Sequence, residues 1–192
     1  MAGKLVLVVG PSGAGKDSLL TAAAERLAED RRFVFPRRMI TRAPDGITEN
    51  HIPISRAEFD ELVANNDVML AWEAHGLGYV IPRDVKRLVA TGKIAVCNGS
   101  RHVVARLRTT IPDSAVVLIA ASPRVCAWRL ATRGREPLDD IAERLARDVV
   151  DLPANTVAAT IENSGPLAES VDAFCTSLMK LASRTAQESA GP

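Results

Sequence analysis

A glycine-rich loop between an apolar strand and a helix constrains this chain more than any other feature of its sequence. Residues 5–9 are only Leu and Val, which is typical of a strand buried in a parallel sheet. The loop GPSGAGKDS follows at residues 10–18, and residues 18–30 are rich in Leu, Ala and Glu, as in a helix. The loop fits the pattern G-x-x-x-x-G-K-[ST], except that Asp17 stands at the hydroxyl position and Ser18 follows it. This order of strand, loop and helix predicts a binding site for a nucleoside triphosphate.

Each part of the loop has an expected role in binding phosphates. Glycines let the backbone N–H groups turn inward around a polyphosphate, and the helix N-terminus adds partial positive charge. We expect Lys16 to reach the β- and γ-phosphates, and Ser18 or Asp17 to hold Mg²⁺ or its water shell. Alternatively, Asp17 is only an acid favoured by the helix dipole. The expected nucleotide-binding residues of the loop are Gly10, Pro11, Ser12, Gly13, Ala14, Gly15, Lys16, Asp17 and Ser18.

Composition narrows the class of protein. A chain of 192 residues with 47% apolar and 24% charged residues suits one α/β domain with a sizeable core. The formal net charge of +1 argues against nonspecific nucleic-acid binding. The three cysteines show no C-x-x-C spacing, so we expect packed thiols in a reducing cytoplasm. We expect neither a signal peptide, since the first strand begins near the N-terminus, nor a membrane span, since no apolar run approaches roughly 20 residues.

Strands alternate with helices along the rest of the chain. Further strands are expected at residues 33–40, 94–97, 115–120 and 156–161, and further helices near 83–90, 103–109, 122–133, 138–150 and 166–181. The alternation predicts an α/β fold with a five-stranded parallel sheet, helices on both faces and ligands at the carboxyl ends of the strands. We expect one domain over residues 1–181, with an insertion at about 42–82 and a short lid at about 133–140. A disordered tail is expected at 182–192.

Three groups of side chains could complete a phosphoryl-transfer site, where catalysis is mainly positioning and charge stabilisation. Arginines flank a short connector, GREP, that could close over a triphosphate: Arg129, Arg133, Arg135, Arg144 and Arg147. The strand at 33–40 and the insertion supply Arg37, Arg38, Arg42, His51, His75 and Tyr79. Asn98 and Ser100 follow a strand end, where they could bind a sugar hydroxyl or simply form a turn. Any one of the arginines beside the connector, taken alone, is more typical of a solvated surface, so the evidence is their cluster around the connector.

Together these motifs resemble the guanylate kinase branch of the P-loop kinases, from Lys4 to about Leu181. The loop, the segment ITRAP at 40–44 and the segment RLATRG at 129–134 are similar to that branch's phosphate loop, acceptor-phosphate segment and lid. The resemblance implies ATP and Mg²⁺ as cofactors. It also implies catalytic roles for Lys16, Arg133, Arg135 and Arg144, and ATP contacts for Arg129 and Asn163.

The acceptor positions depart from the guanylate kinase pattern. Ala71 and Asn98 stand where carboxylates read guanine, so the N–H donors of that base would lack partners. Asp45 replaces the second acceptor-gripping arginine, and His51 replaces a tyrosine. Arg38 stands where a small hydroxyl residue is expected. These departures make GMP a poor candidate for the acceptor.

Five further segments, at 36–42, 49–52, 74–79, 98–101 and 133–136, resemble the ribose 1,5-bisphosphate phosphokinases of phosphonate degradation, as does Asp17 after Gly-Lys. The resemblance implies that ATP and ribose 1,5-bisphosphate give ADP and 5-phosphoribosyl 1-diphosphate (PRPP). The expected acceptor residues are Arg38, Arg42, His51, His75, Tyr79, Asn98 and Ser100. We expect a cytoplasmic monomer or homodimer without nucleic-acid or membrane partners. A nucleoside monophosphate kinase and a catalytically silent interaction module remain alternatives, although Lys16 and the lid arginines argue against a silent module.

Overall fold

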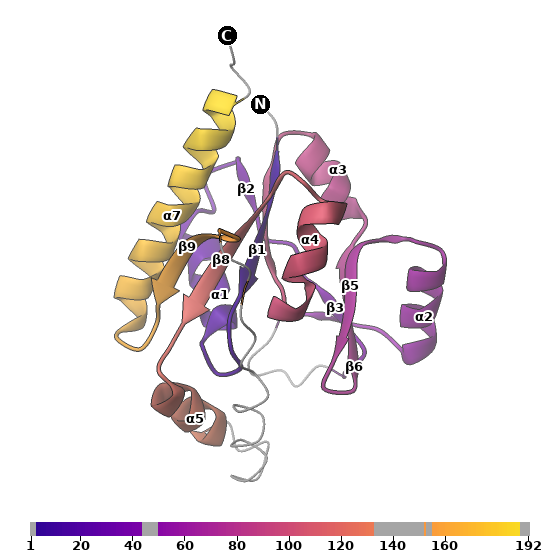
Figure 1. The fold of residues 1–192 in the computed structure, drawn as a ribbon, viewed down its shortest axis with the longest axis horizontal. Coiled ribbons are helices and arrows are strands. Elements are labelled where there is room, and N and C mark those ends of the chain that lie inside the picture. The colour runs from indigo at the N-terminus through magenta and orange to yellow at the C-terminus, as the bar shows by residue number, and fades with distance from the viewer. Residues whose placement is uncertain (1–2, 44–49, 133–151, 153–154, 189–192) are drawn as a thin grey trace.

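A five-stranded parallel sheet forms the centre of the protein (Figure 1). The computed structural model describes residues 3–43, 50–132, 152 and 155–188. The sheet has the order β2-β7-β1-β8-β9, formed by β1 (Lys4–Val9), β2 (Phe33–Val34), β7 (Ile94–Asn98), β8 (Ser114–Ala120) and β9 (Val157–Glu162). All four strand pairs are parallel. The predicted sheet is therefore confirmed, with the glycine-rich loop leaving its central strand.

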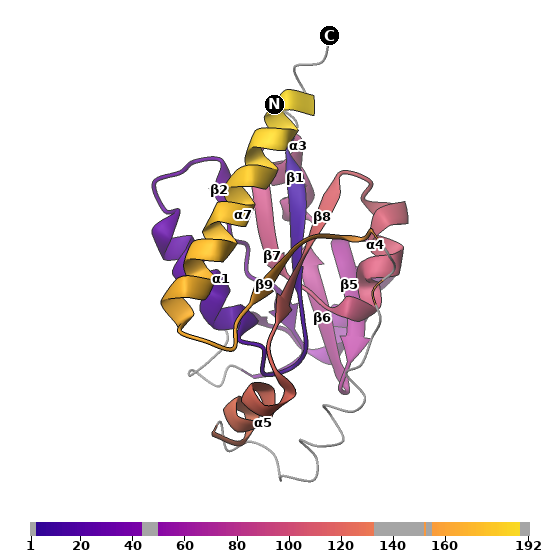
Figure 2. The ribbon, with the colours of Figure 1, turned by 60° about the vertical axis from the view of Figure 1, so that its left-hand side comes forward.

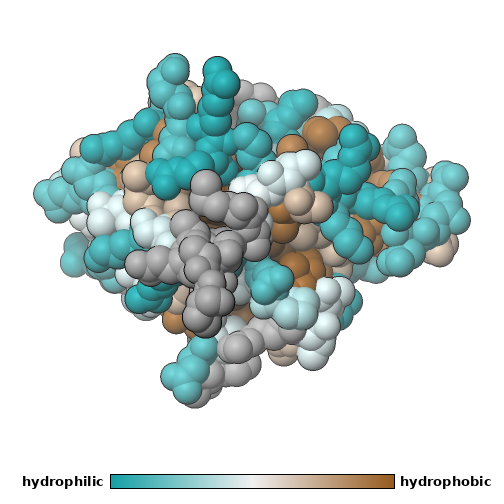
Figure 3. Space-filling model, turned by 90° about the horizontal axis from the view of Figure 1, so that it is seen from above, coloured by the Kyte–Doolittle hydropathy of each residue, from teal (hydrophilic) through white to brown (hydrophobic). Residues whose placement is uncertain are grey.

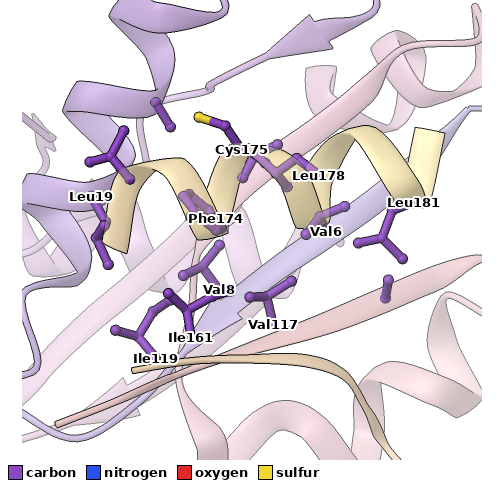
Figure 4. Packing of buried hydrophobic residues seen from close by; sticks show 14 of the residues in the cluster. Val6, Val8, Leu19, Val117, Ile119, Ile161, Phe174, Cys175, Leu178 and Leu181 are labelled. Atoms are coloured by element: carbon purple, nitrogen blue, oxygen red, sulfur yellow. The ribbon is translucent and has the colours of Figure 1, made fainter. Parts of the chain in front are cut away.

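Helices cover both faces of this sheet because β1 is apolar on both sides. Val6 and Val8 face α1 (Lys16–Arg26) and α7 (Leu167–Glu188), which lie side by side (Figure 2). Figure 4 shows Phe174 and Leu178 of α7 packed over these strands. The opposite face packs against α3 (Asp84–Ala90) and α4 (Val104–Thr110), which follows the 3-10 turn Arg101–Val103.

A second sheet of four strands forms most of the expected insertion. Its order is β4-β3-β6-β5, from β3 (Met39–Ile40), β4 (Ile52–Pro53), β5 (Val68–Ala74) and β6 (Leu77–Pro82). Helix α2 (Arg56–Ala64) begins with a capping box, in which Ser55 Oγ accepts from the backbone N–H of Glu58 at 3.1 Å. The prediction of a single strand at residues 33–40 was wrong. Its two ends are β2 and β3 in different sheets, with Pro36, which has no N–H to donate, between them.

The C-terminal helix is longer than the sequence predicted. Helix α7 continues to Glu188, so residues 182–188 are helical and the expectation of a disordered tail from 182 was wrong there. Leu181 and Ala182 continue the apolar face of this helix and are buried against the central sheet. The helix at 122–133 is α5 (Pro123–Thr132), whereas the lid at 133–140 and the helix at 138–150 lie outside the described residues.

The surface at the end of the molecule where β1 begins is mostly hydrophilic, with small apolar areas between hydrophilic side chains (Figure 3). Within the described part of the chain, no helix is long and apolar enough to cross a membrane. The carboxyl ends of the central strands, where the glycine-rich loop and α5 lie, form the opposite end (Figure 1).

Candidate active site

The glycine-rich loop has a backbone conformation that favours glycine at its tightest points. Gly13 and Gly15 have φ values of 80° and 85°, in the left-handed region that other residues rarely adopt. A Cβ atom on Gly15 would lie 2.5 Å from Nδ2 of Asn163. The loop therefore requires glycine at position 15 for its backbone angles and for the close approach of a neighbouring side chain.

Two side chains from distant elements hold this loop by one carbonyl oxygen. Asn163, just after β9, donates from Nδ2 to the carbonyl of Ala14 at 2.7 Å. Arg129 of α5 donates from Nη1 to the same oxygen at 3.3 Å. Asn163 is only 1% exposed, and its own N–H donates to the carbonyl of Ala120 at 2.7 Å. Both residues thus contact the loop itself, while their expected contacts with ATP stay predictions.

The ammonium group of Lys16 lies against the start of the loop. Its Nζ donates to the carbonyl oxygens of Gly10 at 2.8 Å and Pro11 at 2.9 Å. These are exchangeable hydrogen bonds on a flexible stem, so the charge is kept beside the loop and can move to a phosphate oxygen. The position agrees with the role predicted for Lys16 but does not test it.

Asp17 is joined to the carboxyl end of β7. Nδ2 of Asn98 donates to Oδ1 of Asp17 at 2.6 Å, and Asn98 is 7% exposed. The next residue, Ser18, is exposed. Of the two predicted Mg²⁺ ligands, Asp17 is therefore the one anchored at the carboxyl edge of the sheet. A carboxylate at this place suits Mg²⁺, which is usually bound by one or two carboxylates together with substrate phosphates.

Asn98 and Ser100 were predicted to face the acceptor. The structure instead shows the amide of Asn98 in contact with the loop. The hydroxyl of Ser100 accepts from the N–H of His102 at 3.3 Å, which is the turn role that the sequence had left open. Sugar contacts by either residue stay predictions.

The acceptor segment after β3 is braced by a buried histidine. Nε2 of His51, which is 5% exposed, lies 3.1 Å from the carbonyl oxygen of Arg42. Arg42 lines a groove of about 540 Å³ together with Thr41, Pro53, Ser55 and Arg56. Arg56 already pairs with Glu73 at 2.8 Å and Asp60 at 3.0 Å, which holds the pKa of Glu73 below its usual value. Arg42 is the residue of this groove that the sequence predicted to bind an acceptor phosphate, and that role stays a prediction.

Arg38 lies over an aromatic pair in the second sheet. The guanidinium carbon of Arg38 is 5.1 Å from the ring centroid of Tyr79. The ring of Tyr79 stacks on Trp72 with centroids 5.3 Å apart and planes 4° apart. His75, by contrast, is exposed in the turn between β5 and β6, with a φ of 53°. The structure thus brings Arg38 and Tyr79 together. Trp72 is the third residue of this stack, and the sequence analysis did not predict it.

The three catalytic arginines predicted for the lid, Arg133, Arg135 and Arg144, lie outside the described residues.

Behind the site, Cys97 is fully buried in β7, and burial raises the pKa of its thiol to about 12. It therefore stays neutral at physiological pH and serves as a packed thiol, as the sequence predicted for all three cysteines.

A parallel sheet whose central strand leads into this loop, with a small second sheet beside it, defines a P-loop kinase fold. The family model for guanylate kinase matches residues 2–164. A solved guanylate kinase from Anaplasma phagocytophilum has the same fold, with a TM-score of 0.68 and 17% identity, over 93% of this chain and 86% of that one.

Curated relatives define the group more narrowly. A protein of Methylobacterium radiotolerans named ribose 1,5-bisphosphate phosphokinase PhnN is 49% identical over 165 residues, 86% of this chain and 91% of that protein. One of the same name from Brucella melitensis is 41% identical, over 95% of each chain. The chain therefore belongs to the guanylate kinase family and, within it, to the ribose 1,5-bisphosphate phosphokinases.

Proposed function

We propose that this protein transfers the γ-phosphoryl group of ATP to ribose 1,5-bisphosphate, forming ADP and PRPP. The observation that carries the proposal is its 49% identity to a protein named for this kinase activity. Two features of this chain support it independently: Ala71 and Asn98 offer no carboxylate to a guanine base, and Arg38 and Arg42 add cations to the acceptor segments. A sugar with two phosphates suits such a site better than a nucleotide does.

The donor side of the reaction follows from the loop. Its N–H groups and Lys16 would bind the β- and γ-phosphates of ATP. Asp17, oriented by Asn98, would hold Mg²⁺, which supplies neutralising charge to those phosphates. The exposed Ser18 is the weaker candidate for this role.

The acceptor side needs orientation rather than proton transfer. An oxygen of the 1-phosphate attacks the γ-phosphorus, and the bond from that phosphorus to the β–γ bridging oxygen breaks to release ADP. A phosphate oxygen is already anionic, so the step requires no general base. Arg42, whose backbone is braced by His51, would hold an acceptor phosphate. The lid arginines Arg133, Arg135 and Arg144 would stabilise the charge on the transferring group.

We further propose that the protein works in the cytoplasm as a monomer or homodimer, on a small-molecule substrate and without nucleic-acid or membrane partners. The near-neutral formal charge of +1 supports the absence of nonspecific nucleic-acid binding. Phosphonate degradation is the pathway that the resemblance implies.

The experiment is a product assay. Purified protein is incubated with Mg-ATP and either ribose 1,5-bisphosphate or GMP, and the products are followed by ³¹P NMR. We expect diphosphate resonances of PRPP with the sugar and no GDP with GMP. Formation of GDP alone would identify a nucleotide kinase, and no phosphoryl transfer to either acceptor would indicate a silent interaction module.

A further inference from the structure

We propose that Tyr79, supported by Trp72, is a positioning residue that holds Arg38 for the acceptor. We further propose that the same stack leaves no open face of the Tyr79 ring for a nucleobase. The inference rests on the proposed function, because it gives Arg38 a second phosphate of the sugar substrate, beside the one that Arg42 would hold. It departs from the sequence-based expectation that Tyr79 contacts the substrate directly.

The topology of the second sheet places the three side chains in one row. Tyr79 of β6 is paired with Trp72 of β5 and with Ile40 of β3, and β6 lies between these two strands. Arg38 precedes Ile40 by two residues, and such residues share a face of a strand. Arg38 and Trp72 therefore approach the Tyr79 ring from opposite sides of β6, at 5.1 and 5.3 Å from its centroid.

Within the stack, Trp72 and Tyr79 are held by packing, whereas Arg38 keeps the freedom of a long side chain. Trp72 is 7% exposed and packs with the core beneath the second sheet, so it fixes the plane of the Tyr79 ring. Arginine has a planar guanidinium that stacks on aromatic faces while its N–H groups remain available at the edge of the plane. Stacking on Tyr79 uses the face of the guanidinium group, and it therefore reduces the conformational freedom of the Arg38 side chain.

The same arrangement bears on specificity. A purine would gain affinity by stacking on an exposed aromatic ring. Here one side of Tyr79 is covered by Trp72 and the other by Arg38. The stack thus offers a cation to a second phosphate where a base would otherwise find an exposed ring. The positions expected to read guanine, Ala71 and Asn98, already carry no carboxylate.

The test is a set of variants whose Kd for ribose 1,5-bisphosphate and for GMP is measured by calorimetry without nucleotide. Tyr79→Phe keeps the ring and removes the hydroxyl, whereas Tyr79→Leu removes the ring. We expect Tyr79→Phe to bind like wild type and Tyr79→Leu to bind the sugar roughly 3- to 30-fold more weakly. In an Arg38→Ala background, Tyr79→Leu should add less than about 2-fold, because the two residues act together. GMP should not bind to wild type or to Tyr79→Leu, and any GMP affinity should be confined to Arg38→Ala with Tyr79 intact, where one face of the ring is uncovered. Equal GMP affinity in Arg38→Ala with and without Tyr79→Leu would overturn the assignment of this ring as a covered stacking surface.

Val80→Ala is the matched control, since Val80 is fully buried in the same strand but points to the other face. It should lower the melting temperature without changing the Kd. Equal losses for Tyr79→Phe and Tyr79→Leu would overturn the inference in favour of a direct contact from the phenol hydroxyl. Independent effects of Arg38→Ala and Tyr79→Leu would also overturn it. The product assay separates this inference from the proposed function. If the Arg38 and Tyr79 variants show coupled losses of sugar binding but the wild-type protein makes no PRPP, only the proposed function is overturned.

Discussion

The side-chain amide of Asn98 donates a 2.6 Å hydrogen bond to the carboxylate of Asp17, and so ties the phosphate-binding loop to the neighbouring strand. The opposite orientation of the amide would place its oxygen against a carboxylate, which is repulsive, so Asp17 also fixes which way Asn98 points. Asn98 is paired with Val8 across β7 and β1, two residues before the loop begins. The contact therefore orients the one acidic group of the loop.

This contact predicts a defect in metal use when Asn98 is changed. Asn98→Ala should raise the Mg²⁺ concentration needed for half-maximal activity by about 10- to 100-fold, because residues that orient a metal ligand typically contribute that much. The measurement is the rate as a function of free Mg²⁺ at saturating ATP, with Mn²⁺ binding to the protein–ADP complex by EPR as a second readout. Ser18→Ala is the control, and a larger effect of Ser18→Ala would assign the metal to Ser18 instead.

Lys16→Ala should lower turnover by about 10³-fold, because the charge that the loop places on the transferring phosphoryl group is lost. The fold should remain, since Lys16 is only part-buried and its bonds to Gly10 and Pro11 belong to one loop. Circular dichroism checks the fold and a coupled ADP assay measures turnover. Lys180→Ala, on the exposed side of α7, is the matched control. Wild-type turnover in Lys16→Ala would remove Lys16 from the mechanism.

The sequence was most informative where local pattern and tertiary environment agree. Residues 5–9 are apolar at every position, as a strand covered on both faces must be, and β1 is buried on both faces. It was least informative where the chain leaves one sheet for another. The strand expected at 33–40 is apolar enough to be continuous, yet only the position of Pro36 hinted that β2 and β3 separate.

The sequence was a better guide to which residues lie at the site than to the side-chain contacts that those residues make. Asn98 was selected from its place at a strand end, but its partner Asp17 is 81 positions away in sequence, and no local pattern reports such a pair. Trp72 was missed for a similar reason. Its stacking depends on the pairing of β5 with β6, although two aromatic residues flanking a short turn with Gly76 could have indicated a cross-strand pair.

For the lid we expect a change in turnover rather than in ATP binding. Arg133→Ala and Arg135→Ala should reduce kcat more than they raise the KM for ATP, if both side chains engage mainly in the transition state. Steady-state kinetics at saturating acceptor separate the two parameters. An effect confined to KM would make these arginines ground-state phosphate ligands. Arg124→Ala, at the start of α5 and exposed, should change neither parameter.

Burial of Cys97 predicts a contribution to the alkaline stability profile. The pKa of its thiol is raised by burial to about 12 in the folded protein, against an ordinary value of 9.0. Stability from this group is complete below pH 9 and decreases as pH rises towards 12, because the unfolded thiol ionises first. The free energy of unfolding of wild type should therefore fall faster than that of Cys97→Ala, by up to about 1.4 kcal/mol per pH unit. Urea titrations at pH 8, 9 and 10 test this, and parallel profiles would contradict it.

The last prediction concerns Asn163, whose amide holds the carbonyl of Ala14 at 2.7 Å while only 1% of the residue is exposed. Asn163→Ala removes this donor and leaves Arg129 as the other donor to that oxygen among the described side chains. The variant should lose about 1–3 kcal/mol of unfolding free energy, because a buried acceptor is left incompletely bonded.

Asn163→Ala should also raise the KM for ATP more than it lowers kcat, since a loosened loop binds phosphates less well in both the ground and transition states. Asn65→Ala, at the exposed end of α2, is the matched control and should change neither quantity. Asn163 could support the loop or recognise the adenine base. Calorimetry of ATP and ADP binding, together with activity assays that use GTP and dCTP as donors, distinguishes these two roles. A loss shared by all nucleotides fits support of the loop, because every triphosphate uses it. A loss confined to adenine nucleotides would show instead that Asn163 reads the base.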